Sequence, residues 1–184
     1  MNRMALLFAA GTMAFAGVCV AQEQFAVLVP AVLDPNAPIG DAVRRECGVE
    51  SKVGTEVFAR VAERYPAEQV ASAAQAGDRL ILRVTLLSVL GHGGGGWSGT
   101  KAIGIRADVL RDSKVIATRT LSRQSGGGVF GGVTGTCAIM DRIAVALGRD
   151  VAAWLPGAVM VLKYEKPGAD QLVAPREAEA PKQQ

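Results

Sequence analysis

Histidine and cysteine are scarce in this chain of 184 residues, which contains one histidine, His92, and three cysteines. Zinc centres are usually built from several His and Cys ligands, so the sequence predicts no metal and no other cofactor. A large excess of one charge is also absent, because 20 Lys and Arg face 17 Asp and Glu, a formal net charge of +3. This near-neutral balance excludes a nucleic-acid-binding protein that relies on bulk positive charge. No pair of carboxylates stands out as a catalytic pair, and we therefore predict that the protein is not an enzyme.

The first 21 residues have the pattern of a secretory signal peptide. Arg3 is the only charged residue before Glu23, and residues 5–21 are apolar or small. A basic start, an apolar run and a small-residue end at Ala21 are the parts of such a leader. The alternative is a membrane anchor, but 17 residues is at the short limit for a spanning helix. The sequence thus predicts a periplasmic or secreted bacterial protein with no transmembrane segment after cleavage.

The cysteines add to this prediction. Cys19 lies inside the leader, where lipid attachment is an alternative, although the preceding Ala16-Gly17-Val18 departs from a bacterial lipidation box. If Cys19 is removed with the leader, Cys47 and Cys137 remain in an oxidising compartment, which is the number needed for one disulfide. Two buried free thiols are the alternative. A cysteine nucleophile built from Cys137 and His92 is excluded if Cys137 is paired.

Hydrophobic periodicity predicts the order strand, helix, three-strand meander, helix. The expected strands are residues 25–33, 79–90, 101–110 and 115–123, with a hairpin turn at 111–114 and a short strand at 159–164. The expected helices are a short turn at 42–47 capped by Asp41, a helix capped by Ser51 and stopped by Pro66, and one from Thr136 to Pro156. Residues 68–77 fit either a strand or an irregular link. Two amphipathic helices need one sheet face to cover, so we predict an α+β fold. It is a two-layer sandwich, a mainly antiparallel sheet with a three-strand meander backed by two helices.

This pattern gives one α+β domain over residues 22–163. Residues 164–184 are rich in Ala, Pro, Gln and charge and have little to bury, so we expect a disordered C-terminal tail.

Two glycine-rich loops are candidate binding sites. Residues 91–96 match a dinucleotide-binding pattern, but the next segment alternates like a strand and offers no helix N-terminus for a phosphate. The second loop, residues 125–136, runs from a strand into a helix. Its possible anion site consists of Gly131, Gly132, Gly135 and Thr136. The alternative is that these glycines only let the loop pass close to the sheet.

Positive charge is concentrated on the meander. Residues 79–124 contain eight Lys and Arg but only two acids, Asp108 and Asp112. Such a surplus suits an anionic envelope component or an acidic protein partner. The candidate residues of this partner face are Arg83, Arg106, Arg119 and Arg123. The alternative is that these are ordinary solvated strand charges.

Several segments in combination resemble an uncharacterised family of small exported proteobacterial proteins. They are Arg44-Arg-Glu-Cys-Gly-Val-Glu50, Gly93-Gly-Gly-Gly-Trp-Ser-Gly-Thr-Lys101, Gly126-Gly-Gly-Val-Phe-Gly-Gly132, Gly135-Thr-Cys-Ala-Ile139 and Leu147-Gly-Arg-Asp-Val-Ala-Ala-Trp-Leu155. The resemblance implies an envelope location and a paired cysteine, and it implies no activity. A looser likeness, in the meander and last helix, is to short envelope lipoproteins of unknown function.

The sequence as a whole predicts an exported, non-catalytic interaction or accessory domain of the cell envelope. The alternative function is a small-molecule or anion binder that uses the two glycine-rich loops.

Overall fold

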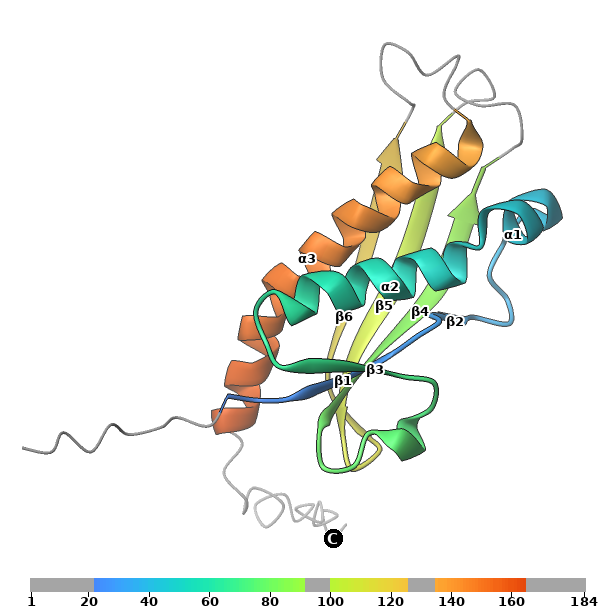
Figure 1. Ribbon diagram of the computed structural model, residues 1–184. Helices are drawn as coiled ribbons and strands as arrows, with labels where there is room; N and C mark the ends of the chain where they lie inside the picture. Colours follow the sequence, from blue (N-terminus) through green and yellow to red (C-terminus); the bar gives the residue numbers. More distant parts are fainter. Residues whose placement is uncertain (1–21, 92–99, 126–134, 165–184) are drawn as a thin grey trace, which may run out of the picture.

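The computed structural model describes residues 22–91, 100–125 and 135–164, which form a mixed α+β domain (Figure 1). The strands are β1 (Phe25–Leu28), β2 (Val32–Leu33), β3 (Ala67–Val70), β4 (Leu80–Leu90), β5 (Lys101–Arg111) and β6 (Lys114–Ser125). The helices are α1 (Asp41–Cys47), α2 (Val49–Ala62) and α3 (Thr136–Tyr164), with a 3-10 turn η1 (Ala73–Gln75). The predicted leader and residues 165–184 of the predicted tail lie outside the described residues, whereas Tyr164, where the tail was expected to begin, is the last residue of α3.

The six strands form one open sheet in the order β3-β1-β4-β5-β6, with β2 also paired to β4. The long strands β4, β5 and β6 are antiparallel neighbours, whereas β1 lies parallel between β3 and β4. Asp112 and Ser113, in the turn between β5 and β6, have φ of 50° and 65°. Two successive left-handed residues are typical of a two-residue hairpin turn, which confirms the predicted turn. The structure confirms the predicted mainly antiparallel sheet with its meander.

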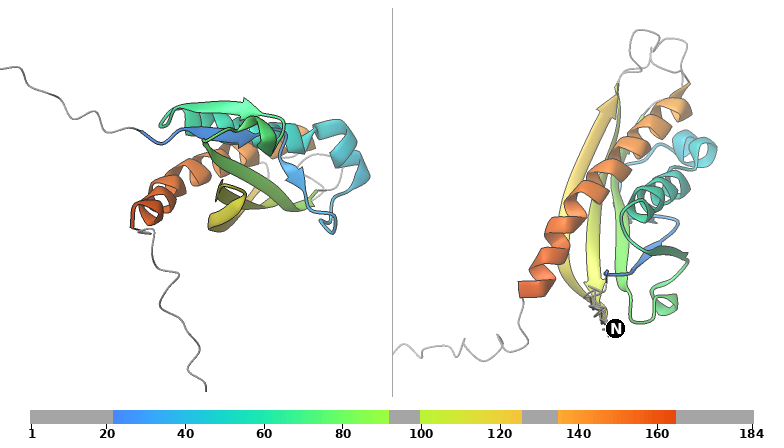
Figure 2. Two further views of the ribbon diagram at one scale, coloured as in Figure 1. Left: turned by 90° about the horizontal axis from the view of Figure 1, so that it is seen from below. Right: turned by 60° about the vertical axis from the view of Figure 1, so that its left-hand side comes forward.

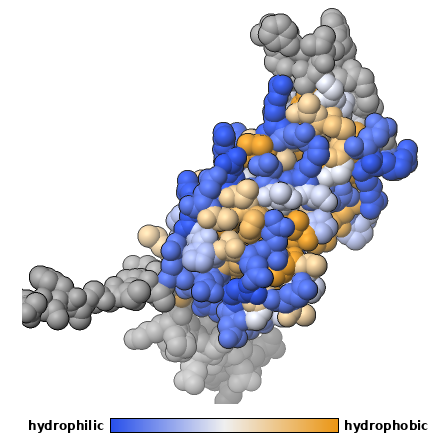
Figure 3. Space-filling view, in the orientation of Figure 1, coloured by the Kyte–Doolittle hydropathy of each residue, from blue (hydrophilic) through white to orange (hydrophobic). Residues whose placement is uncertain are grey.

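The helices α2 and α3 pack on the same face of the sheet and against one another, and Figure 2 shows both on one side of the strands. The predicted stripe on β5 faces them, because Ile103, Ile105, Ala107 and Val109 are all 0% exposed. The matching stripe of α3 is equally buried and consists of Ile139, Ile143, Leu147, Val151 and Leu155. On the outer side of the helices, hydrophilic side chains surround smaller apolar areas (Figure 3). The two-layer architecture is therefore held by one core between helices and sheet.

Helix α3 is also the one described helix whose length and composition would suffice to cross a membrane, over Thr136–Leu162. Its apolar stripe, however, forms the core against β5 and β6. In the most apolar 18-residue window of α3, 39% is buried inside the domain, so this packing uses part of its hydropathy.

Four local predictions are wrong or incomplete. The expected strand 25–33 is split into β1 and β2 around Pro30, which cannot donate a ladder hydrogen bond. Ser51 does not cap α2, because α1 ends at Gly48, whose left-handed φ of 56° lets α2 begin immediately at Val49. Asp41 lies in the first turn of α1 and Gly40 takes the N-cap position. The ambiguous residues 68–77 contain both β3 and η1.

The predicted end of α3 at Pro156 and the predicted strand at 159–164 are also wrong. Helix α3 continues through Pro156 to Tyr164. Pro156 is exposed, whereas Ala158 and Val159 beyond it are only 3% and 7% exposed. Burial of these residues against the core outweighs the hydrogen bond that the proline cannot make.

Candidate functional site

A disulfide between Cys47 and Cys137 joins the end of α1 to the first turn of α3, with the two Cα atoms 5.0 Å apart. This confirms the predicted pairing. Cys47 is only 3% exposed and Cys137 is partly buried against the same core. The pairing also removes Cys137 as a nucleophile.

The four arginines of the predicted partner face fall on opposite faces of the sheet. In the antiparallel register Arg83 pairs with Asp108, and Arg106 pairs with Thr120. Along β5, Asp108 and Arg106 alternate with the buried stripe. Arg83, Arg106 and Asp108 therefore lie on the face of the sheet that α2 and α3 leave uncovered, which we call the open face. Arg119 pairs with Ala107, and Arg123 with Ile103, which places both on the helix-covered face at the β6 edge.

On the open face, Arg83, Arg106, Asp108 and Thr118 form a connected cluster, which we call the arginine cluster. Arg83 Nη2 and Arg106 Nε donate to Asp108 Oδ2 at 3.1 and 3.3 Å, and Thr118 Oγ1 donates to Asp108 Oδ1 at 2.8 Å. The Asp108 side chain is 4% exposed, whereas those of Arg83 and Arg106 are 35% and 41% exposed. One buried carboxylate thus holds two guanidinium groups that reach solvent, and the cluster keeps one surplus positive charge.

Asp108 is held in its ionised form by this cluster. Its burial acts to raise the pKa, but the hydrogen bonds from Thr118, Arg83 and Arg106 outweigh it and lower the pKa below that of an ordinary aspartate. One donor remains unused, because Arg83 Nε is buried without a hydrogen-bond partner among the described residues. Arg60 Nε, which lies outside this cluster, is likewise buried without a partner among the described residues.

The lowered pKa predicts a pH dependence of stability. Since the folded protein binds the Asp108 proton less tightly than the unfolded chain, the stabilisation is complete above about pH 4, the ordinary aspartate pKa. It is lost as pH falls through the lower folded pKa. We therefore expect the free energy of unfolding to fall less steeply with acid in Asp108→Asn than in the wild type. Denaturant unfolding between pH 5 and pH 2 measures this, and parallel curves for the two proteins would contradict it.

The rest of the open face carries small and polar side chains together with Leu90, which is 53% exposed and pairs with Ala102. Beside the arginine cluster, Ser88, Gly104 and Ser122 form the next row across β4, β5 and β6. A Cβ at Gly104 would lie 2.7 Å from Ser88 Oγ, so only glycine fits this row without a shift. At its other end the face is covered by η1, where Ala26, Val70, Ala76, Ile81 and Leu110 form a small second core. The uncovered area therefore offers small polar side chains around two arginines.

A second group lies where β6 meets α3. A groove of about 440 Å³ is lined by Arg119, Leu121, Ser122 and Arg123 of β6 and by Asp150, Ala153 and Trp154 of α3. Arg123 Nε and Nη2 donate to the two Asp150 oxygens at 2.6 and 2.7 Å, and these bonds raise the pKa of Arg123. We call this the β6–α3 groove.

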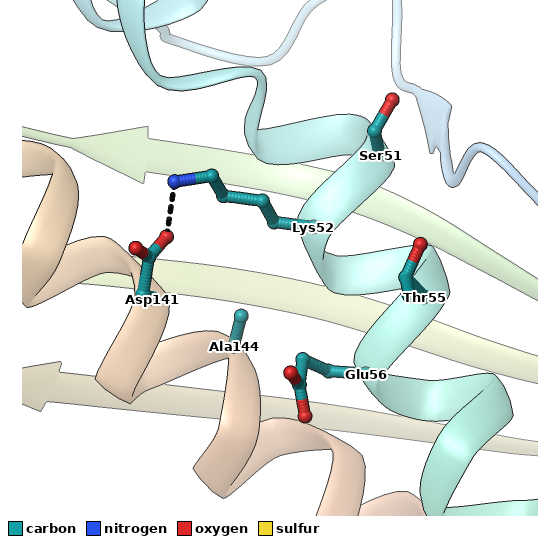
Figure 4. A pocket seen from close by; sticks show the side chains of 6 residues that line it. All are labelled: Ser51, Lys52, Thr55, Glu56, Asp141 and Ala144. Carbon is teal, nitrogen blue, oxygen red and sulfur yellow. Dashed lines mark hydrogen bonds and ion pairs between the residues drawn. The ribbon is translucent and has the colours of Figure 1, made fainter.

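A third hollow, of about 380 Å³, lies between α2 and α3 (Figure 4). Lys52 of α2 reaches across it to an ion pair with Asp141 of α3, and Glu56 points into the same space. Lys52 and Asp141 neutralise one another, and Glu56 is paired with Arg60 at 3.9 Å, so the residues that line this hollow offer no surplus positive charge for an acidic ligand. Among the described residues, no group of three or more His, Cys, Asp or Glu could hold a metal ion.

The predicted anion site is described only in part. Gly131 and Gly132, like His92, lie outside the described residues. The Gly135 carbonyl accepts the first helical hydrogen bond of α3 from Ile139, at 3.2 Å, and Thr136 is 9% exposed. The anion site remains a prediction.

Three residues of these surfaces were not singled out from the sequence. Asp108 was counted only as an acid of the meander, although its i, i+2 spacing from Arg106 puts both on one strand face. Asp150 and Trp154 were not connected with the arginines, because only the packing of α3 across β6 brings them together.

Comparison with known proteins shows no matching family model and no matching curated protein. Among solved structures, a hypothetical protein from Chlamydia trachomatis is 13% identical, with a TM-score of 0.48, covering 76% of this chain and 99% of that chain. A PelC dodecamer from Paraburkholderia phytofirmans is 12% identical, with a TM-score of 0.45, and the match covers 70% and 87% of the two chains. A Xanthomonas campestris protein of the DUF330 family is 10% identical, with a TM-score of 0.43, and the match covers 77% and 88%. The chain thus resembles hypothetical and uncharacterised proteins, at a level that assigns no function.

Proposed function

We propose that this protein is an exported, non-catalytic interaction domain of the bacterial cell envelope, and that its open sheet face binds an acidic protein partner. The observation that carries the proposal is the arginine cluster, in which two solvent-reaching guanidinium groups share one buried carboxylate. The surplus charge and the partly exposed guanidinium groups of Arg83 and Arg106 favour an additional carboxylate at this place.

Export is supported by two independent features. The first is the apolar leader with its small-residue end at Ala21. The second is the disulfide between Cys47 and Cys137, a bond that persists in oxidising compartments and is rare in the cytosol.

The cluster favours a protein over a lipid surface. Attraction to an anionic membrane amounts to about 1 kcal/mol for each basic residue near the surface, so membrane binding needs several unpaired cations together. The arginine cluster supplies a surplus of only one. A planar guanidinium instead recognises an individual carboxylate through paired hydrogen bonds. The small side chains of the row Ser88, Gly104 and Ser122 let a protein surface approach closely.

The test compares two substitutions that each remove one exposed arginine. Arg106→Gln removes a donor of the open face, whereas Arg45→Gln removes an exposed arginine of α1 for which no ion pair is found among the described residues. We expect an acidic partner isolated from envelope extracts on the wild-type protein to bind Arg106→Gln about tenfold or more weakly, the loss typical of one charge-assisted contact. Arg45→Gln should bind it as the wild type does.

Affinity is measured by titration of the purified partner at low and at high salt. Binding should weaken as salt rises, because exposed charges are screened beyond about 10 Å at 0.1 M. Equal affinities of the two variants would refute the open face as the binding surface. Retention on anionic lipid vesicles that is equally sensitive to both substitutions would indicate a lipid partner instead.

A further inference from the structure

Among the described residues, strand β6 ends the sheet and has one unpaired edge. It is 12 residues long, and among the described strands it pairs with β5 alone. Every second residue of such a strand directs its backbone N–H and C=O outward, which makes the edge a template for another strand. The length of β6 is enough to hold a complete added strand.

The charges of β6 select against a second copy of the same strand. Its residues include Lys114, Arg119 and Arg123 and no acid. Antiparallel pairing of two β6 strands would bring like charges together, which is destabilising. Basic residues on an edge are a known defence against such self-association, and they attract a strand that carries acidic side chains.

The β6–α3 groove runs along this edge and offers places for side chains. Figure 2 shows α3 crossing over β6 on the helix-covered side of the sheet. Arg123 is neutralised by Asp150, but no ion pair or hydrogen bond of the Arg119 side chain is found among the described residues. Leu121 and Trp154, both partly buried, line the same groove and present apolar surface.

We propose that the free edge of β6 binds an extended acidic segment of a partner protein as an additional antiparallel strand. One carboxylate of that segment pairs with Arg119, and a neighbouring apolar side chain on the same face packs over Leu121 and Trp154. Main-chain hydrogen bonds supply the affinity and the alternate side chains supply the selectivity, as in other cases of strand addition. The surface differs from the proposed open-face site, since Arg119 and Arg106 lie on opposite faces of the sheet.

The probe is a labelled ten-residue peptide with glutamate and valine taking turns at every second position and threonine between them, so that both types of side chain share one face of the strand. Two matched peptides serve as controls, one with every glutamate replaced by lysine and one with alternate backbone nitrogens methylated. We expect the full domain to bind the first peptide and neither control. Amide hydrogen exchange should slow along residues 114–125 of the bound protein. Arg119→Glu should weaken binding of the peptide by about tenfold or more. Arg119→Gln should also weaken it, but by less, because it removes the positive charge without adding a negative one. Arg45→Gln, which removes an exposed arginine of α1 outside both proposed surfaces, should bind like the wild type.

Several results would overturn the inference. One is that the methylated peptide binds as tightly as the unmethylated acidic peptide, which would mean that no strand is added. Another is that the bound peptide does not slow amide hydrogen exchange in residues 114–125, or slows it only in other segments. Concentration-dependent dimerisation that protects β6 would assign the edge to a second copy. Circular dichroism and the melting temperature confirm that the Arg119 variants are folded, and this test leaves the open-face proposal unaffected.

Discussion

Replacing Cys47 and Cys137 together by alanine is expected to lower the free energy of unfolding by about 2–5 kcal/mol, the usual cost of losing a native disulfide. The bond links positions 90 residues apart, and a long closed loop strongly restricts the unfolded chain. It also ties α1 and the start of α3 together over the core. The melting temperature should fall by more than about 5 °C in a domain of this size.

The oxidised protein, the reduced protein and the double alanine variant are compared by thermal and urea unfolding. Reduction should reproduce the effect of the substitutions, whereas the reductant should leave the double variant unchanged. Two freely titratable thiols in the native protein, or equal stability of all three forms, would contradict the assignment.

Gly148→Ala is expected to destabilise the protein by about 1–3 kcal/mol, as overpacking does. A Cβ at Gly148 would lie 2.7 Å from the Glu56 carbonyl oxygen and 3.2 Å from Arg60 Cγ. The first of these atoms belongs to the backbone of α2, so the two helices would have to move apart. This cost opposes the gain of about 1 kcal/mol that alanine normally brings to a helix interior.

Gly157→Ala provides the matched control on the same helix. No atom lies within 4 Å of a Cβ at Gly157, and only the propensity gain applies, up to about 1 kcal/mol. The two identical substitutions in α3 should therefore change the urea midpoint in opposite directions. A stabilised Gly148→Ala protein would show that α2 and α3 do not approach this closely.

The regular parts of the fold were predictable from the sequence, because their side-chain periodicity follows directly from burial. The alternation of Ile103, Ile105, Ala107 and Val109 predicted β5, and the 3.6-residue stripe predicted the buried side of α3. The end of α3 was not predictable. Pro156 is a strong local stop signal, and only the burial of Val159 in the core shows why the helix continues.

The candidate surfaces were predictable in composition but not in arrangement. The surplus of basic residues on the meander could be counted, yet the face of each arginine depends on strand register. Both pairings of the meander shift register, between Leu86 and Ser88 and between Val109 and Leu110. These shifts are not visible in the sequence pattern. The second one places Arg119 opposite Ala107, on the helix-covered face, and without it Arg119 would pair with Arg106 on the open face.

The most direct test of the proposed function is site-specific photocrosslinking in living bacteria. A photoreactive residue is placed at Thr120, which is exposed on the open face opposite Arg106, or at Ala59, which is exposed on α2. We predict that Thr120 crosslinks to an acidic envelope protein, that Arg106→Gln suppresses the product, and that mass analysis of it shows the chain without residues 1–21. Crosslinks from Ala59 alone, or a product that retains the leader in the cytoplasm, would contradict the proposal.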